Sequence, residues 1–579
     1  MPRSAARWLA PRVLVGTGIK SLLAAIFGAY ADKRELQGGL PAIIHSHATG
    51  EEIWLDYVAD LGDGFDATYS VASLLAAPEL VMTGVRPLPR AQVLVMGGDQ
   101  VYPSASTRAY EDRAKGPYRA ALPRADGRTP SLFALPGNHD WYDGLTAFLR
   151  VFGQRRPFGG WATEQTRSYF AIELPKRWWL LAIDTQFDDY VDGPQLEYFR
   201  AVSKKLRDGD SVILATSTPA WVKAGSGRDD KGYDTFEFVM REIVTPSGAV
   251  VRVMVSGDKH HYARYVERGG DGQRITCGLG GAYLAATHEL PHRLDLPPRR
   301  SRVRNPSPQT TFDLAEEYPS RAASRAMAAG IFRLPWRNPG FWALTGTLQT
   351  IMTLAVLFGI VADDRLGLPG AFGVAAAWAP AAIVSVLLVL GGMAFAGLDS
   401  AGAKLSAAVG VLHAAAHLAL SVCWGLVVIW MYRTVWPAGF DPELATLIVV
   451  FVGTPLLIGF LDAELVAIYL MLASKLDINL NEVMAGQSIE DHKGFMRMHV
   501  GADGSLTIYP VKLPTVSRAW RAVPDGAPDT PWLVPDGPAL EPELIEAPIR
   551  LEGLVPSVST QAGAATGTTV RTSVQRLDE

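Results

Sequence analysis

Hydrophobic and polar residues follow different patterns in different parts of the chain. From about residue 51 to residue 290, short apolar runs alternate with helical or polar stretches. The runs that read as buried strands are Gln92–Met96, Ser131–Leu135, Trp178–Ile183, Ser211–Ala215 and Val250–Val255. Most are followed by a polar loop, often with glycine, and layered α/β folds carry their functional residues in such loops. The pattern therefore predicts a layered α/β domain.

A second pattern occupies residues 341–472, which are almost free of charged side chains. Four apolar segments here reach the roughly 20 residues needed to cross a bilayer. They are Phe341–Val361, Ala371–Phe395, Leu405–Tyr432 and Leu444–Leu472. Soluble core helices of this length would carry a polar face, and these segments do not. We therefore expect an all-α domain of four transmembrane helices in contact with the lipid bilayer.

The distribution of arginine predicts the orientation of these helices. Four arginines precede the first span, whereas each later connection has a single basic residue. They are Arg321, Arg325, Arg333 and Arg337. Basic residues favour the cytoplasmic side, and an even number of spans returns the chain to the side where it started. We expect a multi-pass protein of the cell (inner) membrane, with its catalytic domain and C-terminus in the cytoplasm.

The segments on either side of the α/β domain are expected to have simpler roles. Residues 1–50 contain the apolar stretch Val13–Tyr30 after three arginines, which fits either a signal peptide or an amphipathic helix. Lys20 interrupts this stretch and charged residues follow it directly, so a helical segment of the mature protein is favoured. Residues 291–340 are rich in arginine and proline and are expected to form a linker.

The tail after the membrane segments contains a predicted β-hairpin within residues 473–535. Its strands are Phe495–Val500 and Ser505–Pro510, joined through Asp503-Gly504. Because a two-stranded hairpin is marginally stable alone, we expect it to dock on the catalytic domain. Residues 536–579 are rich in proline, alanine, glycine, serine and threonine, and are expected to be disordered.

Composition excludes several classes of function. The 579 residues are too many for one core and suggest about two to four domains. A net charge of −4 gives no support for a nucleic-acid partner. The two cysteines, Cys277 and Cys423, exclude a disulfide framework and make a cysteine-based metal site a poor hypothesis.

Four short motifs in the first half of the chain carry the candidate chemistry. They are Asp60-Leu61-Gly62-Asp63-Gly64, Gly98-Asp99-Gln100-Val101-Tyr102, Gly137-Asn138-His139-Asp140 and Gly257-Asp258-Lys259-His260-His261. Each follows or closely neighbours a strand and offers Asp, Asn or His, which suit Mn, Fe, Zn or Mg. One such pair could be an ordinary turn, but four in sequence at strand ends indicate a metal site.

This series of motifs resembles the calcineurin-like metallophosphoesterase superfamily, and in local pattern its purple acid phosphatase branch. That family reads Gly-Asp-x-Gly, Gly-Asp-x-x-Tyr, Gly-Asn-His-Asp/Glu, Val-x-x-His and Gly-His-x-His, and the resemblance covers about residues 50–290. It implies a layered β-sandwich flanked by helices. It also implies that Asp60 and His260 bind a first metal ion, Asn138 binds a second, and Asp99 bridges the two.

The resemblance further assigns catalytic and supporting roles. His139 would protonate the leaving oxygen or stabilise the transferring phosphoryl group, and Asp140 belongs to the same catalytic element. Tyr102 matches the position that binds ferric iron in purple acid phosphatases, although most other members use no such tyrosine. Asp63 and His261 are candidates either for metal binding or for support of the ligands.

Two positions depart from the family pattern, and both concern the second metal ion. Ser217 stands where the Val-x-x-His element has histidine, and Asp258 replaces the first histidine of the last element. The second site would then consist of oxygen ligands from Asp99, Asn138, Asp258 and Ser217. Oxygen ligands favour Mg or Mn over Zn. We expect two divalent metal ions with Mn preferred and Fe, Mg or Zn as alternatives; a weak or vacant second site stays open.

These residues predict hydrolysis of a phosphomonoester or phosphodiester by a metal-activated hydroxide. The membrane domain fits a lipid-linked substrate such as a phospholipid or a polyprenyl phosphate. A non-catalytic, ligand-sensing membrane receptor built on a degenerate phosphoesterase domain is the alternative from another class. A small transporter with a regulatory phosphoesterase domain is a third hypothesis.

The membrane spans themselves carry ionisable residues. His413 and His417 lie four residues apart in the third span, on one helical face, and Asp462 and Glu464 lie in the fourth. Both pairs fall at matching depths. Because ionisable groups are costly inside a bilayer and usually face one another, these four residues form a candidate intramembrane polar site. It is either a functional constellation or a pair that locks two helices together.

Overall fold

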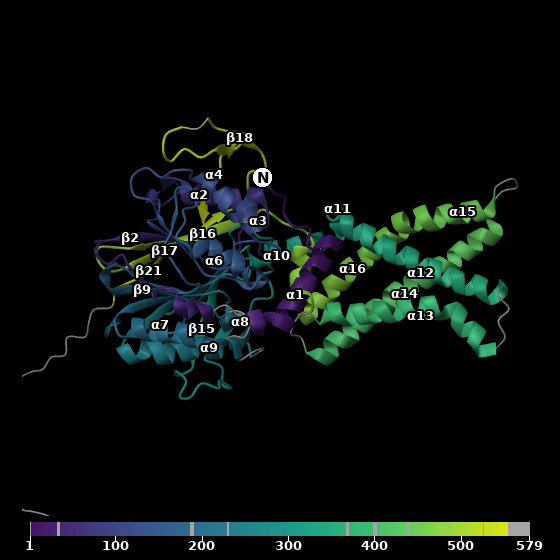
Figure 1. The fold of residues 1–579 in the computed structure, drawn as a ribbon, viewed down its shortest axis with the longest axis horizontal. Coiled ribbons are helices and arrows are strands. Elements are labelled where there is room, and N and C mark those ends of the chain that lie inside the picture. The colour runs from purple at the N-terminus through teal and green to yellow at the C-terminus, as the bar shows by residue number, and fades with distance from the viewer. Residues whose placement is uncertain are drawn as a thin grey trace, which may run out of the picture.

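The computed structural model describes residues 2–31, 35–185, 190–227, 231–365, 370–397, 402–436, 441–524 and 526–553. A layered α/β domain forms one end of the molecule, and a bundle of long helices extends from it (Figure 1). The predicted fold class, an α/β domain flanked by helices together with a four-helix membrane domain, is confirmed.

Two β-sheets form the α/β domain. Among the described residues, the larger has nine strands in the order β1 (Ile44–Ser46), β8 (Phe170–Glu173), β9 (Trp178–Ile183), β10 (Ser211–Thr216), β11 (Val250–Ser256), β13 (Gln273–Cys277), β12 (Tyr262–Glu267), β15 (Thr310–Tyr318) and β14 (Arg293–Leu296). In the same part of the chain the other runs β20 (Glu543–Leu544), β17 (Leu506–Leu513), β16 (Lys493–Val500), β2 (Ile53–Val58), β5 (Val93–Met96), β6 (Ser131–Ala134) and β7 (Ala162–Thr163). A further strand, β21 (Ile549–Leu551), also pairs with β17.

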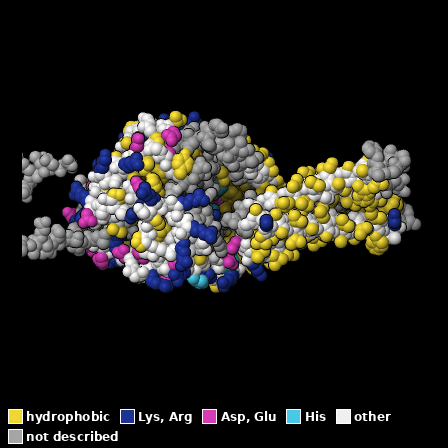
Figure 2. All heavy atoms as spheres, turned by 90° about the horizontal axis from the view of Figure 1, so that it is seen from below, with side chains coloured by type: hydrophobic (Ala, Val, Ile, Leu, Met, Phe, Trp, Pro, Cys, Tyr) yellow, Lys and Arg dark blue, Asp and Glu magenta, His cyan; other side chains and the backbone are white. Residues whose placement is uncertain are grey.

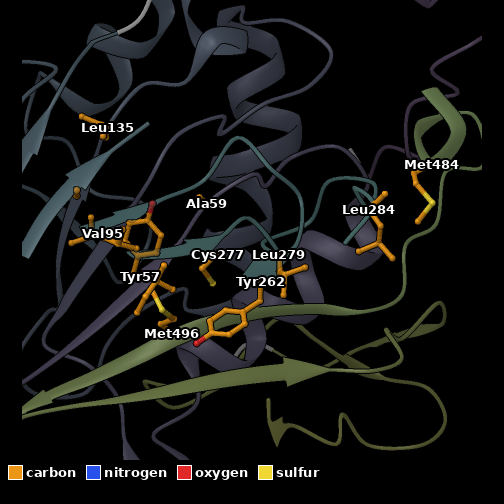
Figure 3. Packing of buried hydrophobic residues seen from close by; sticks show 14 of the residues in the cluster. Tyr57, Ala59, Val95, Leu135, Tyr262, Cys277, Leu279, Leu284, Met484 and Met496 are labelled. Carbon is orange, nitrogen blue, oxygen red and sulfur yellow. The ribbon is translucent and has the colours of Figure 1, made fainter. Parts of the chain in front are cut away.

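Alternation of side chains along the strands builds the layers. Leu55 and Tyr57 of β2 belong to the core between the two sheets, together with Val253 of β11. Trp54 and Val58, which alternate with them on β2, belong to the opposite layer. Because successive residues of a strand point to opposite faces, each strand contributes to both layers. Figure 3 shows the core between the sheets, where Tyr57, Val95, Tyr262 and Met496 pack together.

Helices cover the outer face of each sheet. The eight-stranded sheet packs against α2 (Phe65–Ala76), α4 (Gly116–Ala121) and α6 (Thr146–Phe152). The nine-stranded sheet packs against α7 (Gly193–Ser203), α8 (Ala220–Gly225) and α9 (Lys231–Val239). The domain is therefore a helix–sheet–sheet–helix sandwich.

The interpretation of residues 291–340 as a linker requires correction. They contain β14 and β15 of the larger sheet, followed by α10 (Arg321–Ala328) and α11 (Leu334–Arg337). Leu294, Leu296 and Phe312 are buried in the layer under α8 and α9. Arginine and proline dominate the composition of this segment, but its few apolar residues are enough to join the sheet.

The tail after the membrane helices returns to complete the smaller sheet. β16 and β17 form an antiparallel hairpin, and β16 also pairs with β2, so that Met498 lies opposite Leu55. Arg497 of β16 makes a buried two-bond ion pair with Asp56, at 2.8 and 2.7 Å. β20 and β21 lie within the segment expected to be disordered, and they pair with β17. Residues 554–579 lie outside the described residues.

Four candidate membrane spans are long and apolar enough to cross a bilayer within the described residues. They are Pro339–Ala362, Gly373–Ala396, Ala403–Thr434 and Pro442–Leu476. The helices concerned are α12 (Pro339–Arg365), α13 (Gly370–Ala396) and α14 (Ala403–Thr434), followed by the continuous run of α15 (Pro442–Ile448), η7 (Val449–Ile458) and α16 (Gly459–Ala473). Their surface is almost entirely hydrophobic (Figure 2). Glycines allow close crossings, because a Cβ at Gly410 would lie 2.5 Å from the Gly392 carbonyl oxygen.

The bundle and the α/β domain share one hydrophobic core. Val466 and Leu470 of α16 belong to the same buried cluster as Met484 of α17 (Leu480–Ala485) and Leu284 of the α/β domain. Figure 3 shows Met484 and Leu284 side by side at this junction. The helix α1 (Pro11–Ala31) contacts α12 at the same end of the bundle.

Candidate active site

Three aspartates end strands at the edge where the two sheets meet. Asp60 follows β2, Asp99 follows β5 and Asp258 follows β11, and all three have a left-handed backbone, with φ of 58°, 50° and 67°. Residues other than glycine seldom adopt this conformation, and they do so most often at functional sites. Hydrogen bonds connect the loops that carry these aspartates. The Asp60 amide donates to the Gly98 carbonyl at 3.0 Å, and the Asp258 amide donates to Asp60 Oδ1 at 3.1 Å.

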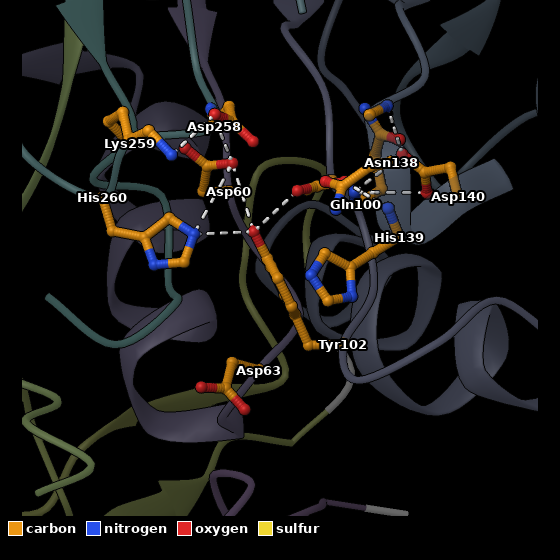
Figure 4. Close-up of polar contacts among 12 residues, drawn as sticks. Asp60, Asp63, Gln100, Tyr102, Asn138, His139, Asp140, Asp258, Lys259 and His260 are labelled. Carbon is orange, nitrogen blue, oxygen red and sulfur yellow. Dashed lines mark hydrogen bonds and ion pairs between the residues drawn. The ribbon is translucent and has the colours of Figure 1, made fainter. Parts of the chain in front are cut away.

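The hydroxyl of Tyr102 lies at the point where the predicted ligands converge. It is 3.2 Å from Asp60 Oδ1, 3.0 Å from Asp99 Oδ2 and 2.9 Å from His260 Nε2. Figure 4 shows the phenol pointing between Asp60 and His260. The structure therefore brings Asp60, Asp99, Tyr102 and His260 into direct contact.

Burial sets the charge state of this cluster. Asp60 and Asp99 are 0% and 2% exposed. Burial, and then the neighbouring carboxylates of Asp99 and Asp258, raise the pKa of Asp60 well above its usual range, and burial also raises the pKa of Asp99. Burial and the nearby Lys259 lower the pKa of His260, which keeps its imidazole neutral. A cation beside the carboxylates would remove the electrostatic cost of ionising them together.

Buried oxygen atoms without partners, and glycines packed against the carboxylates, make this group of residues suitable for a metal ion. Among the described residues, Asp60 Oδ2 and Asn138 Oδ1 are buried without a hydrogen-bond partner. A Cβ at Gly278 would lie 2.0 Å from Asp60 Oδ2, and one at Gly137 would lie 2.1 Å from Asp99 Oδ1. Both positions therefore exclude a side chain, and the oxygen-rich donors suit a hard divalent cation.

The described residues contain no group of three His, Cys, Asp or Glu side chains that could hold a metal ion by themselves. Two of the predicted ligands, Tyr102 and Asn138, are of other residue types. The Tyr102 hydroxyl lies between the carboxylates and the imidazole. Any metal site here therefore depends on residues besides the acidic and imidazole side chains.

The residues predicted for the second ion lie in the adjoining loops. Asp258 Oδ2 is 3.1 Å from the Lys259 ammonium. Ser217 follows β10, and a Cβ at Gly98 would lie 3.7 Å from its Cβ. The side-chain nitrogen Nδ2 of Asn138 donates to the Tyr142 hydroxyl at 3.5 Å. The site is thus asymmetric: Asp60, Asp99 and His260 share the Tyr102 hydroxyl, whereas no described contact joins Asp258, Ser217 or Asn138 to it.

His139 has one ring nitrogen available for proton transfer. Its Nδ1 lies 2.8 Å from the Pro103 carbonyl oxygen, so Nδ1 carries the proton of the neutral ring and Nε2 stays an acceptor. Its backbone amide donates to Asp99 Oδ1 at 2.9 Å, and its ring lies 4.4 Å from the Tyr102 ring. These contacts fix the imidazole directly beside the cluster.

The carboxylate of Asp140 is fully buried between two loops of the site. Its carboxylate accepts from the amides of Gly137 at 2.9 Å and Gln100 at 3.3 Å, and from the Tyr110 hydroxyl. Asp140 therefore ties the loop of Asn138 and His139 to the loop of Asp99. It acts as a positioning residue.

The N-terminal segment reaches the site through Asp63. Asp63 accepts from the Ala6 amide at 2.8 Å and from the Trp8 indole at 3.2 Å. The Trp8 ring meets the rings of Tyr102, His139 and Tyr283 edge to face, at 5.7, 5.7 and 5.2 Å. Asp63 is thus an anchor for the segment that covers the site. Trp8 and Tyr283 are absent from the sequence prediction, because an isolated aromatic residue outside any motif gives no signal.

A cavity of about 310 Å³ lies between Asp258 and the end of the domain next to the membrane helices. Asp258, Lys259 and His261 line one side, and Leu480 and Asn481, just beyond the fourth span, line the other. Burial lowers the pKa of His261 to about 3, so its imidazole is neutral. His261 faces this cavity and has no contact with Tyr102 or Asp99 among the described interactions.

The predicted intramembrane site forms in part. His417 Nδ1 lies 2.6 Å from Asp462 Oδ1, and His417 Nε2 lies 2.8 Å from His413 Nε2. Among the described contacts, Glu464 makes no hydrogen bond to these three residues. Three of the four predicted residues are therefore brought together.

No family model matches the chain, and no curated protein sequence matches it significantly. Solved structures give distant matches. GAP50, described as the anchor in the inner membrane complex of Plasmodium, aligns with a TM-score of 0.30 and 13% identity over 40% of this chain and 74% of its own. The purple acid phosphatase PPD1 from yellow lupin seeds aligns with a TM-score of 0.27 and 12% identity, over 42% of this chain and 46% of its own. PhoD aligns with a TM-score of 0.26 and 11% identity, over 40% of this chain and 58% of its own. Likeness at this level carries no argument about activity, so any functional inference rests on the site itself.

Proposed function

We propose that the chain is a metal-dependent phosphoesterase that hydrolyses a phosphomonoester or phosphodiester at a membrane surface. The observation that carries this proposal is the convergence of Asp60, Asp99 and His260 on a single point, the Tyr102 hydroxyl, within 3.2 Å. Burying two carboxylates beside a neutral imidazole is unfavourable in a purely structural role. It is the arrangement that metal-assisted hydrolysis requires.

Each residue has a distinct role in this proposal. Asp60, Asp99 and His260 would hold one divalent ion, and Asn138, Asp258 and Asp99 a second, weaker one. When bound, such ions neutralise the phosphoryl oxygens and supply an attacking water at neutral pH. With Nδ1–H held by the Pro103 carbonyl, His139 would first take up a proton on Nε2 and then, as an imidazolium, give that proton to the leaving oxygen. Asp140 and Asp63 would keep the loops in register, and manganese is the expected metal because the second donor set is all oxygen.

The cavity beside the site supports a lipid-linked substrate. Its lining has the charged groups of Lys223 and Lys259 beside three carboxylates (Asp258, Glu289 and Asp477), and apolar surface from Val222, Leu290 and Leu480. A phosphoester on a lipid needs both kinds of surface, and this cavity lies where the fourth span meets the α/β domain. We therefore propose a phospholipid or polyprenyl phosphate as substrate.

The helix arrangement supports a multi-pass protein of the inner membrane with the catalytic domain and C-terminus in the cytoplasm. α12 begins and α16 ends at the same end of the bundle, next to the α/β domain (Figure 1). Arg333 and Arg337 lie at this end, where the positive-inside rule favours cytoplasm.

The activity can be tested on the purified full-length protein in detergent. Metal content is measured first, and turnover of a chromogenic phosphodiester is then followed before EDTA treatment, after it, and after addition of Mn²⁺. We expect turnover that disappears with the metal and returns with Mn²⁺. Metal or ligand binding without any turnover would favour the sensing receptor instead.

Substrate class requires a separate comparison. Hydrolysis of a long-chain phospholipid in vesicles is compared with hydrolysis of a soluble short-chain ester that has the same head group. We expect a higher kcat/KM for the long-chain lipid. Equal values would leave the phosphoesterase proposal intact and remove the lipid-linked substrate from it.

A further inference from the structure

The helix bundle encloses a hydrogen-bonded chain of ionisable side chains that the proposed hydrolysis does not use. His417 of α14 is 2.6 Å from Asp462 of α16, and His413, one turn earlier on α14, is 2.8 Å from His417. His413, His417 and Asp462 are 9%, 8% and 1% exposed. The spans Pro339–Ala362 and Gly373–Ala396 contain no Asp, Glu, Lys, Arg or His. Within the described contacts, the three groups are hydrogen-bonded to one another.

The hydrogen-bond partners determine where the protons lie. His417 Nδ1 donates to the Asp462 carboxylate, so His417 Nε2 is an acceptor, and the proton between the imidazoles belongs to His413 Nε2. His413 Nδ1 then has a lone pair. Among the described residues this nitrogen is buried and without a hydrogen-bond partner. In this arrangement the three groups together carry the single negative charge of Asp462.

One added proton would make this group neutral. A proton that binds at His413 Nδ1 leaves one positive imidazole and one carboxylate, and a net charge inside a bilayer is costly. If each proton shifts by one bond along the chain, the proton on His413 Nε2 moves to His417 Nε2 and that on His417 Nδ1 moves to Asp462. The same three groups can thus bind a proton at one end and carry it to the other.

The surroundings of His413 favour a positive charge at this point. The ring of Tyr469 on α16 stacks on His413 at 3.7 Å with an angle of 4° between the planes, and an aromatic face stabilises a cation placed over it. α12 contributes Gln349, whose amide lies 3.5 Å from the His417 carbonyl oxygen, and α13 contributes Phe395. Asp462 and Tyr469 are therefore the titratable groups that face the two imidazoles from the packed helices.

A polar path leads from this cluster toward the α/β domain. The Tyr469 hydroxyl donates to Asn479 Oδ1 at 2.7 Å, and Asn479 Nδ2 donates to the Phe395 carbonyl oxygen at 2.9 Å. Asn479 lies between Asp477 and Leu480, which both line the cavity beside the candidate active site. Tyr469, which stacks on His413, thus links this imidazole to a residue next to the cavity.

We propose that His413, His417 and Asp462 form a proton-binding relay within the membrane domain. This role is independent of the proposed hydrolysis. It goes beyond a structural ion pair, because a pair that only locks two helices has no need of the second imidazole or of its unpaired nitrogen.

The test uses the full-length protein with ¹⁵N-labelled histidine in lipid vesicles. Solid-state NMR distinguishes neutral from charged imidazoles, and spectra are recorded from about pH 9 to about pH 5. His413→Gln and Asp462→Asn identify the relevant signals among the 11 histidines. Thr454→Val is the matched control, because it removes an interhelical hydrogen bond of 2.8 Å from Trp424 that involves no titratable group.

We expect a charged imidazole signal that grows as the pH falls and is missing from His413→Gln. In Asp462→Asn the same transition should require a proton concentration at least about tenfold higher, because the neighbouring negative charge is gone. Thr454→Val should titrate like the wild type. Two imidazoles that stay neutral throughout in the wild type would overturn the proposal and leave a structural pair. A spectrum that changes only when Zn²⁺ or Mn²⁺ is added would also overturn it, in favour of a metal site.

Discussion

The Tyr102 hydroxyl lies 3.0 Å from Asp99 Oδ2, in the middle of the groups that sequence motifs assign to metal binding. Burial and the carboxylates of Asp60 and Asp99 raise the pKa of Tyr102 well above its usual range, so the phenol is neutral. It is a hydrogen-bond partner for the carboxylates and for His260 when no ion is held. If the site binds a metal ion as proposed, the tyrosine would couple the stability of the metal-free site to metal binding.

Replacing Tyr102 by Phe should destabilise the metal-free protein by about 1–3 kcal/mol, because Asp99 Oδ2 and His260 Nε2 lose their buried partner. Added Mn²⁺ should recover most of this loss, since an ion can satisfy the same atoms. The thermal unfolding midpoint with and without Mn²⁺ measures both effects. If Mn²⁺ stabilises the wild type but not the variant, Tyr102 is itself a required ligand and this account of it is wrong.

His139→Ala should keep its bound metal and slow turnover by roughly 10²- to 10⁴-fold, the usual contribution of a general acid. The backbone amide that donates to Asp99 is unchanged by this substitution, so the ligands should stay in place. His288→Ala, whose ring contacts Ser324 away from the site, is the matched control and should turn over normally. Loss of metal with unchanged turnover per bound ion would make His139 a ligand or a support.

Asp258→His should shift the metal preference from Mn²⁺ toward Zn²⁺, because a nitrogen ligand replaces an oxygen ligand at the second position. Histidine tolerates the left-handed backbone at this residue, where φ is 67°. The dissociation constants of both ions are measured for the wild type, for Asp258→His and for the exposed control Asp126→His. An unchanged ratio in Asp258→His would remove this residue from the metal site.

His45 should make the α/β domain sensitive to acid. Its ring lies 4.8 Å from the Phe133 ring, and burial, followed by His47 and Arg155, lowers its pKa from 6.5 to about 4. Between these values the unfolded chain takes up a proton that the folded chain refuses, so stability falls as the pH falls. His45→Gln should therefore lose less stability than the wild type between about pH 6.5 and about pH 4. An equal loss of stability in the two proteins over this pH range would refute a half-buried, neutral His45.

Local patterns in the sequence were sufficient for the strands and for most of the candidate site. The five predicted strands correspond to β5, β6, β9, β10 and β11, and the motifs at the ends of β5 and β11 supply Asp99 and Asp258. Glycine beside aspartate at a strand end is a local signal, and it identifies residues that the fold then gathers.

The sequence predicts that the tail hairpin docks on the catalytic domain, but the partners in this and other contacts between distant parts of the chain were outside the reach of such patterns. The pairing of β16 with β2, and with it the buried pair of Arg497 and Asp56, joins residues on either side of the membrane helices. Trp8 is held at the site in part by Asp63, which accepts hydrogen bonds from it and from the Ala6 amide. The β14–β15 segment was misread because its composition resembles a linker, whereas burial of Leu294 and Phe312 decides its structure.

Metal analysis of Asp99→Asn tests the central claim most directly. The substitution keeps the shape of the side chain and removes one negative charge from the point where the two ions would meet. Bound Mn²⁺ and turnover of the chromogenic phosphodiester are measured together, with Asp313→Asn, an exposed residue paired with Arg268, as the control. We predict that Asp99→Asn loses both bound metal and turnover while the control keeps both. An Asp99→Asn protein that binds Mn²⁺ and hydrolyses the ester like the wild type would contradict the assignment of this site.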